Sequence, residues 1–260
     1  ISGKLGLVGT ISTWKDVQAI VRRGQANRYF RIGDQLMSLY DGEPIVWVVV
    51  GIDHDEPSDP NYINSMTIQT QDCIDNVQFD APEPNNLDED RKNKGNNRYI
   101  HSAKRQWLNS SADTFQWQSQ HQYDAPPTSS SNIYNGPGFL KLIDPELVAV
   151  LGKVKKQVAR NTVTDDGGQD IFEDKVFPLS RVEVGLDSEG DTTGEKVYPY
   201  YQGASNADRI KLLNGSARTW WLRSPCVSYS DYVRGVVTDG SLNRYYAYRA
   251  LGAAPACVII

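Results

Sequence analysis

The chain has 260 residues, a formal net charge of -5 and three cysteines. A chain of this length can bury a sizeable core in one large domain or two small ones. Since it has no internal repeat and no Gly/Ser linker, we predict one domain over residues 1–260. The acidic balance and the lack of a basic run argue against nucleic-acid binding, and no apolar segment indicates membrane insertion or a signal peptide.

The cysteines are Cys73, Cys226 and Cys257. Their small and odd number does not indicate a disulfide framework, so we expect reduced thiols. A bridge between Cys226 and Cys257 is the alternative, because these two lie towards the ends of one C-terminal stretch.

The first third of the chain carries signals for a helix and a hairpin. Thr13 followed by Asp16 is a capping-box pattern, and the helical spacing behind it predicts an amphipathic helix over residues 13–25. Asp41-Gly42-Glu43 is typical of a hairpin turn. The expected strands cover residues 31–40, 44–53 and 66–74. A Pro- and Asn-rich surface loop is expected to follow them over residues 80–97.

The middle of the chain alternates short helices, strands and loops. Asp144-Pro145 predicts a helix start, because Pro suits the first turn, and Asn214-Gly215 predicts a helix C-cap. Helices are expected over residues 102–109, 144–150 and 207–213. Strands are expected over residues 153–163 and 177–184, and a loop is expected over residues 126–137.

Two acidic groups raise the question of calcium, whose protein ligands are oxygen atoms. The first group is Asp53, His54, Asp55, Glu56 and Asp59, and the second is Asp165, Asp166, Asp170, Glu173 and Asp174. Neither has EF-hand spacing, so we expect solvated loops without a metal. Calcium is the alternative, more so in the second group, where two glycines permit close wrapping of backbone carbonyls. His101 and His121 lack further ligands for zinc and are expected to be ordinary hydrogen-bonded histidines.

The C-terminal stretch, residues 220–260, begins and ends with apolar runs typical of core strands, Trp220-Trp221-Leu222 and residues 256–260. Polar and aromatic residues without a single period lie between them, with many Tyr and Arg. These types are enriched at binding hot spots, and Tyr presents a large rigid ring at a small cost in side-chain entropy. The pattern predicts a ligand-binding segment held between core strands.

The same stretch lacks particular residue types. From Cys226 to Ile260 there is no Lys, Glu, Gln, Met or Trp, although about six are expected from average usage. An Asn codon whose two adenines are randomised while its third base stays a pyrimidine can encode most amino acids, but never these five. The absence fits diversification of that kind.

A family resemblance is carried by four motifs of this stretch: TWWLRSP, VRGV, TDGSL and APACVI. They resemble the variable region of diversity-generating retroelement target proteins, in the subfamily with the domain of unknown function DUF6273. Earlier segments are similar to the same family: TWKDVQAIVRRGQANRYFRIGDQL, NRYIHSAKRQWLNS, GFLKLIDPELVAVLGKVKK and LSRVEV. The resemblance implies an α+β, C-type lectin fold of the formylglycine-generating-enzyme branch, with long loop insertions and a variable ligand-display region within residues 220–260.

The resemblance also implies which positions vary. They match Asn-type codons of the family's template and are Tyr229, Asp231, Tyr232, Val237, Asn243, Arg244, Tyr245, Tyr246, Tyr248, Arg249, Ala250 and Leu251, with Cys226 less certain. VRGV, TDGSL and APACVI would form the fixed frame. Asp239-Gly240 is a hairpin signal, so residues 233–237 and those after Leu242 are expected to form neighbouring strands whose outward side chains make one surface.

We predict a hypervariable binding protein of bacterial or phage origin that recognises a protein or glycan ligand and needs no cofactor. The resemblance implies display on a cell surface or a phage particle. Two alternatives stay open: an enzyme of the formylglycine-generating type using Cys226 and Cys257, and an oligomerisation module whose aromatic patch joins copies of the chain. The sequence contains no P-loop, nucleophile elbow, dinucleotide fingerprint or zinc motif, which favours binding over catalysis.

Overall fold

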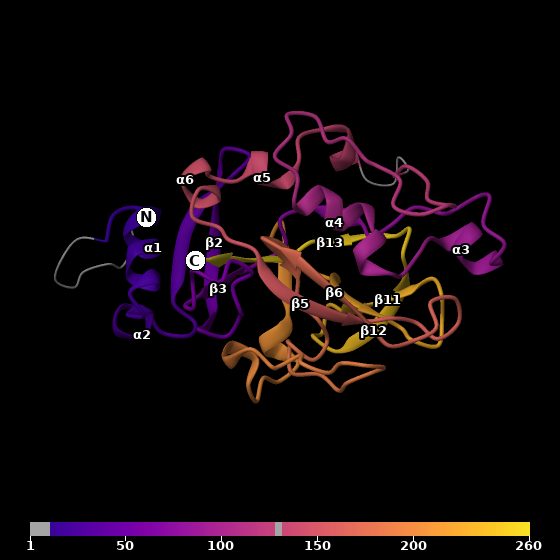
Figure 1. The fold of residues 1–260 in the computed structure, drawn as a ribbon. Coiled ribbons are helices and arrows are strands. Elements are labelled where there is room, and N and C mark those ends of the chain that lie inside the picture. The colour runs from indigo at the N-terminus through magenta and orange to yellow at the C-terminus, as the bar shows by residue number, and fades with distance from the viewer. Residues whose placement is uncertain (1–10, 128–131) are drawn as a thin grey trace.

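The computed structural model describes residues 11–127 and 132–260 as short helices combined with mainly antiparallel sheets, an α+β architecture (Figure 1). The first sheet has the order β1-β2-β3-β14-β7, and every neighbouring pair in it is antiparallel. Its strands are β1 (Gln35–Tyr40), β2 (Glu43–Ile52), β3 (Met66–Thr70), β14 (Pro255–Ile259) and β7 (Val176–Pro178).

The second sheet has the order β12-β11-β10-β13-β4, in which only the pair β10 and β13 is parallel. Its strands are β12 (Leu242–Tyr246), β11 (Tyr232–Val236), β10 (Trp220–Pro225), β13 (Ala250–Gly252) and β4 (Asn76–Gln78). Two separate hairpins pair β5 (Val154–Ala159) with β6 (Gln169–Asp174), and β8 (Lys211–Leu213) with β9 (Ser216–Arg218).

The helices are short. The α-helices are α1 (Trp14–Arg22), α2 (Ala26–Tyr29), α3 (Glu89–Lys94), α4 (Ala103–Leu108), α5 (Phe139–Leu142) and α6 (Pro145–Val148), and the 3-10 turns are η1 (Tyr99–His101), η2 (Asn132–Asn135), η3 (Pro199–Tyr201) and η4 (Ala207–Arg209). Within the described ranges, no helix combines the length and apolar character needed to cross a bilayer.

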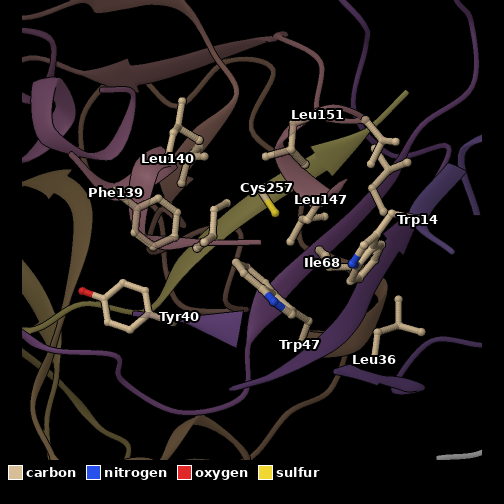
Figure 2. Packing of buried hydrophobic residues seen from close by; sticks show 14 of the residues in the cluster. Trp14, Leu36, Tyr40, Trp47, Ile68, Phe139, Leu140, Leu147, Leu151 and Cys257 are labelled. Atoms are coloured by element: carbon tan, nitrogen blue, oxygen red, sulfur yellow. The ribbon is translucent and has the colours of Figure 1, made fainter. Parts of the chain in front are cut away.

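The first hydrophobic core lies between the first sheet and the helices α1, α5 and α6. Trp14, Trp47 and Phe139 pack there with almost no exposed surface, beside Cys257 of β14 (Figure 2). The predicted capping box starts α1, since the Thr13 hydroxyl accepts from the Asp16 amide at 3.2 Å and the Asp16 carboxylate accepts from the Thr13 amide at 3.0 Å. These bonds satisfy two of the N–H groups that a helix start leaves without partners.

The second core lies beneath the second sheet and contains both tryptophans of β10. The Trp221 indole donates to the Val77 carbonyl at 2.8 Å, and the Trp220 indole donates to the Arg209 carbonyl at 3.0 Å. Burying an indole without a partner for its N–H is unfavourable, so these bonds fix β10 against its surroundings. The prediction of a core strand at Trp220-Trp221-Leu222 is confirmed.

The C-terminal stretch belongs to both sheets. β10 to β13 lie in the second sheet, and two residues later the chain enters β14, between β3 and β7 of the first sheet. The Gln18 side chain of α1 then donates to the carbonyl of Ile260 at 2.6 Å. The positions predicted from the sequence to vary therefore lie between two buried strands, β10 of the second sheet and β14 of the first sheet.

Several local predictions are confirmed. Asp41 and Gly42 form the expected turn between β1 and β2 with φ values of 49° and 80°, which suit the type I′ turn of a two-residue hairpin. α4 lies within the helix predicted over residues 102–109, and α6 begins at the predicted Asp144-Pro145, where Asp144 is the cap and Pro145 lies in the first turn. β5 lies within the strand predicted over residues 153–163.

Other predicted elements are wrong. The helix expected over residues 207–213 is a 3-10 turn followed by strand β8, and Asn214-Gly215 is the hairpin turn between β8 and β9 rather than a C-cap. The two positive φ values, 52° and 76°, fit either role, so the sequence pattern was ambiguous. The strand expected over residues 177–184 ends at Pro178, because the chain turns at residues 181–185.

Residues 80–97 are not a surface loop. They contain α3, and Asp80, Glu83, Asn96 and Asn97 are fully buried. The loop expected over residues 126–137 contains η2, and its residues 128–131 lie outside the described residues.

Candidate ligand-binding face

Tyrosine and arginine side chains gather on the edge strand of the second sheet. The register of β11 and β12 pairs Tyr232 with Tyr246 and Arg234 with Arg244. Directly paired residues of antiparallel strands project to the same side of the sheet. Tyr232, Arg244 and Tyr246 therefore share one side.

Four tyrosine rings form a continuous row on this side. Tyr229, in the segment before β11, meets Tyr232 edge-on with ring centroids 5.0 Å apart. The Tyr232 and Tyr246 centroids are 4.4 Å apart, and Tyr246 stacks on Tyr248 at 6.0 Å with an interplanar angle of 9°. A hydrogen bond with Tyr246 is the main reason that the pKa of Tyr232 rises to about 12. The rings hold one another in place, as aromatic pairs of this geometry do.

Two exposed arginines lie over the row. The Arg244 guanidinium carbon is 4.5 Å from the ring centroid of Tyr229 and 5.1 Å from that of Tyr232, and the Arg249 carbon is 5.3 Å from that of Tyr248. These distances are in the range of cation–π attraction. We call this set the tyrosine–arginine face: Tyr229, Tyr232, Arg244, Tyr246, Tyr248 and Arg249.

A buried amide supports the face from below. The Asn97 side chain donates to the carbonyls of Tyr229 at 2.6 Å and Tyr232 at 3.0 Å, and the Asn161 amide donates to Asn97 at 2.9 Å. Both asparagines have no exposed surface. The backbone that carries the first two tyrosines is thus hydrogen-bonded to segments more than sixty residues away in the sequence.

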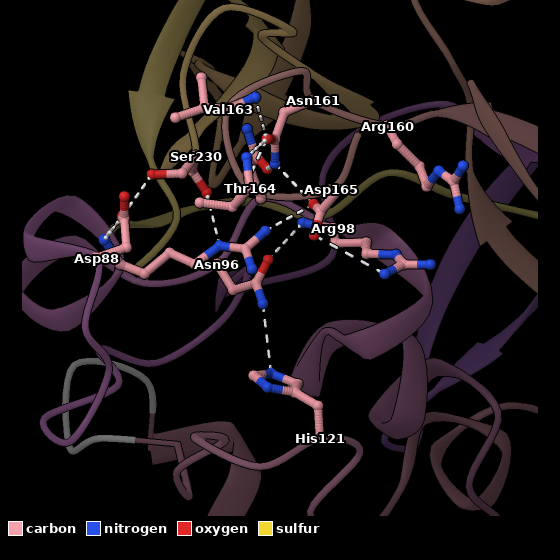
Figure 3. Close-up of polar contacts among 12 residues, drawn as sticks. Asp88, Asn96, Arg98, His121, Arg160, Asn161, Val163, Thr164, Asp165 and Ser230 are labelled. Atoms are coloured by element: carbon pink, nitrogen blue, oxygen red, sulfur yellow. Dashed lines mark hydrogen bonds and ion pairs between the residues drawn. The ribbon is translucent and has the colours of Figure 1, made fainter. Parts of the chain in front are cut away.

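Charged groups extend this support (Figure 3). Asp165 accepts from Asn161 at 2.7 Å and pairs with Arg91 at 2.6 Å, and the Ser230 hydroxyl donates to Asp88 at 2.7 Å. Because these donors and acceptors are largely buried, each needs its partner. The segment 226–231 therefore has little freedom, although it contains no regular secondary structure.

Glu189 anchors β11 on the same side. It accepts from Arg234 at 2.7 Å and from the Val227 amide at 3.1 Å, and it also pairs with Arg181. The Arg234 side chain therefore stabilises the scaffold through its ion pair with Glu189. This agrees with its place in the VRGV frame rather than among the positions implied to vary.

Asp231 is fully buried beneath the face. Its carboxylate accepts no hydrogen bond among the described residues, and the Lys94 ammonium lies 3.7 Å away. Burial, with a smaller contribution from the like charge of Asp90, raises the pKa of Asp231. Lys94 also lies 4.9 Å from the Tyr246 ring centroid, so α3 contacts both the buried acid and the row of rings.

The other positions implied to vary lie outside the tyrosine–arginine face. Tyr245 projects to the opposite side of β12 and meets Trp221 at 6.4 Å. Asn243 is exposed on that opposite side. Val237 is half-buried beside the hairpin turn, while Ala250 and Leu251 lie in β13, paired with β4. Cys226 is buried, and burial raises its pKa.

All three cysteines are free, so the alternative of a Cys226–Cys257 bridge is wrong. Cys257 lies in the first core, whereas Cys226 lies beside Glu189, with its sulfur 3.6 Å from the carboxylate. Burial raises the pKa of both thiols, which makes thiolate formation less favourable.

The two acidic groups of the sequence are dispersed among cationic partners. Asp55 pairs with Lys156 at 2.8 Å, Asp170 with Arg98 at 2.7 Å and Asp174 with Arg105 at 2.9 Å. Asp170, Glu173 and Asp174 belong to strand β6, not to the predicted loop. In the part of the chain that the structure describes, no three His, Cys, Asp or Glu side chains form a group that could hold a metal ion. His101 and His121 stack on each other at 4.9 Å, and Glu83 pairs with His121 at 3.0 Å.

A cavity of about 300 Å³ lies between β2, β3 and residues 200–212, and it shares no residue with the tyrosine–arginine face. The face itself lies on strands and turns, and its four tyrosines are half-buried and its two arginines exposed. Such surfaces suit macromolecular ligands better than small molecules, which bind in enclosed pockets.

A family model described as "Domain of unknown function (DUF6273)" matches residues 61–260. No curated protein and no solved structure is detectably similar to the chain. The matched range contains the whole tyrosine–arginine face and the buried residues that support it.

Proposed function

We propose, from the premise that the chain belongs to the DUF6273 family, that it is a hypervariable ligand-binding protein and the target of a diversity-generating retroelement. In this proposal the tyrosine–arginine face binds a protein or glycan ligand without cofactor or catalysis, on a cell surface or phage particle. The fold is proposed to be a C-type lectin fold with long insertions.

One observation carries the proposal. Six side chains from two turns and two strands form the continuous tyrosine–arginine face, and all six belong to positions that the family resemblance implies to be variable. Tyrosine and arginine are the types most enriched at binding hot spots. A scaffold needs no such row for its own folding, because the two cores lie elsewhere.

The contrast between face and frame supports the same proposal. Val233, Gly235 and Val236 of the VRGV motif are buried, and a Cβ atom at Gly235 would lie 3.0 Å from the Trp220 carbonyl oxygen. The frame is therefore intolerant of change, while the face has room for it. A protein diversified for binding requires this division.

The test compares two sets of tyrosines. In one variant Tyr229, Tyr232, Tyr246 and Tyr248 become Ser; in the control the exposed Tyr29 and Tyr200, which are outside the face, become Ser. Both variants are melted and screened against a displayed protein library and a glycan array. We expect melting temperatures within about 5 °C of the parent and loss of binding in the face variant only.

Two results would count against the proposal. Unfolding of the face variant, with the control intact, would make the row a core element. Binding that survives in a folded face variant would place recognition elsewhere. Sedimentation of the same samples tests the oligomerisation alternative, because self-association lost only in the face variant would assign the row to contacts between copies.

A further inference from the structure

The two arginines of the tyrosine–arginine face differ from those of the surrounding scaffold. Scaffold arginines near the face pair with carboxylates: Arg91 with Asp165, Arg98 with Asp170, and both Arg181 and Arg234 with Glu189. Arg244 and Arg249 are exposed and form no ion pair with any carboxylate of the described residues. Two unneutralised guanidinium groups thus lie on one surface of a chain whose net charge is -5.

The acids nearest to the row do not neutralise them. Asp231 is buried with Lys94 as its nearest cation, and Asp90 is paired with the same lysine at 2.7 Å. Arg244 reaches the neutral Cys226 side chain in addition to the two rings. The exposed charge of the face is therefore positive, and it attracts an anionic partner.

The ring contacts favour carboxylates over sugar rings. Each tyrosine already contacts another ring, and cations lie over all four: Arg244 over Tyr229 and Tyr232, Lys94 over Tyr246, and Arg249 over Tyr248. Little ring surface is left for stacking with a sugar. A guanidinium lying over a ring still presents N–H groups in its own plane, the geometry that binds a carboxylate in bidentate fashion.

We infer that the ligand of the tyrosine–arginine face is an acidic segment of a protein, with its carboxylates bound by Arg244 and Arg249. The inference rests on the proposed function and specifies the chemistry of its ligand. The rings of the row are half-buried on strands and turns, and such a surface suits an extended or flat protein segment better than a small anion.

The experiment uses the whole chain and a phage-displayed library of random peptides. Peptides are selected on the parent protein and counter-selected on the folded variant with the four face tyrosines changed to Ser. We expect enrichment of Asp and Glu. Binding of the selected peptides should weaken at least about 10-fold when salt rises from about 0.05 to about 0.5 M, since exposed charges are screened.

Charge variants then test the two arginines. Arg244→Gln with Arg249→Gln should weaken binding of the selected peptides at least about 10-fold, and replacement of both by Lys should restore only part of it, because Lys lacks the bidentate fork. The control is Arg23→Gln with Arg28→Gln, which removes the same charge from exposed residues at the end of α1 and in α2. These two helices lie at the opposite end of the molecule from β11 and β12 (Figure 1). The control should bind as the parent does.

The outcomes separate this inference from the proposed function. Neutral or basic peptides that depend on the tyrosines, or acidic peptides indifferent to the Arg→Gln changes, would overturn the acidic ligand and leave ligand display intact. Hits on a glycan array alone would also overturn it. If neither peptides nor glycans bind in a way that depends on the tyrosines, both the inference and the proposed function fail.

Discussion

Asp231 shows that a position implied to vary is not necessarily a ligand contact. Its carboxylate is buried beneath the tyrosine–arginine face, without a hydrogen bond among the described residues and with Lys94 at 3.7 Å. A buried charge with incomplete pairing is unfavourable, and here it raises the pKa. A substitution at this position would therefore act on the scaffold, because the side chain is buried.

The raised pKa gives a prediction about pH. A carboxyl group whose pKa is higher in the folded state favours folding when protonated, so its ionisation destabilises the fold as pH rises above the ordinary pKa of Asp. Asp231→Asn should therefore stabilise the protein at neutral pH, by about 1 kcal/mol for the removed unsatisfied group. The gain should vanish below about pH 3.9. Urea unfolding of the parent and of Asp231→Asn, at neutral pH and below about pH 3.9, measures this difference in the free energy of unfolding.

The control for this prediction is Asp239→Asn in the hairpin turn. Asp239 is exposed, and bonds from the Ser241 hydroxyl and amide lower its pKa, the opposite direction. The substitution should give no gain at neutral pH. Equal or lower stability of Asp231→Asn at neutral pH would show that Lys94 fully compensates the buried charge.

At the scale of elements, the segment 226–231 is rigid without being a helix or a strand. Asn97 holds three backbone carbonyls of this segment. Its side chain donates to the carbonyls of Cys226 at 3.4 Å and Tyr229 at 2.6 Å, and its backbone N–H donates to the Ser230 carbonyl at 3.1 Å. Pre-ordering of a binding segment lowers the entropy lost on association. Under the proposed function, the buried Asn97 would lower this entropic cost without contacting the ligand itself.

Asn97→Ala should lower the free energy of unfolding by about 2 kcal/mol, because the carbonyls of Tyr229 and Tyr232 lose their buried donor. Binding of any ligand selected on the parent should weaken as well, even in the fraction that remains folded. Denaturant unfolding and titration calorimetry measure the two effects. Asn93→Ala, an exposed residue of α3 in the same region, is the control and should change stability by less than about 0.5 kcal/mol.

At the scale of the whole molecule, the segment that carries the tyrosine–arginine face is enclosed between core strands rather than appended. After β13 the chain enters β14, which pairs with both β3 and β7, and Ile260 accepts from Gln18 of α1. The residues that display the face are thus flanked by β10 in the second sheet and β14 in the first. We therefore expect substitutions on the face to leave this frame in place, and loss of the frame to remove the face.

Truncation tests that difference. Deletion of residues 256–260 removes most of β14, leaves β3 and β7 without their shared neighbour, and exposes Trp14 and Ile68 of the first core. We expect a chain that loses its near-ultraviolet circular dichroism and resistance to trypsin. The four-Ser face variant, which leaves β14 intact, should keep both, and retention of both by the truncated chain would show that β14 is dispensable for folding.

Much of the local structure was predictable because its signals are local. Thr13 with Asp16, Asp41-Gly42 and Ser102 each determine a cap or a turn through contacts within a few residues. The hairpin at Asp239-Gly240 followed from the same kind of signal, and β11 and β12 pair around it. The prediction failed where one local pattern suits two structures, as at Asn214-Gly215.

The sequence by itself determined the α+β class, the core strands around the C-terminal stretch, and the presence of tyrosines and arginines suited to binding. Only the tertiary structure decided which of them meet. Period-two alternation directs Tyr246 to the face and Tyr245 to Trp221 once the register of β12 is set, and Asn97 and Asn161 become supports through contacts with residues far along the chain. Burial and pairing depend on those distant contacts, and no local pattern specifies them.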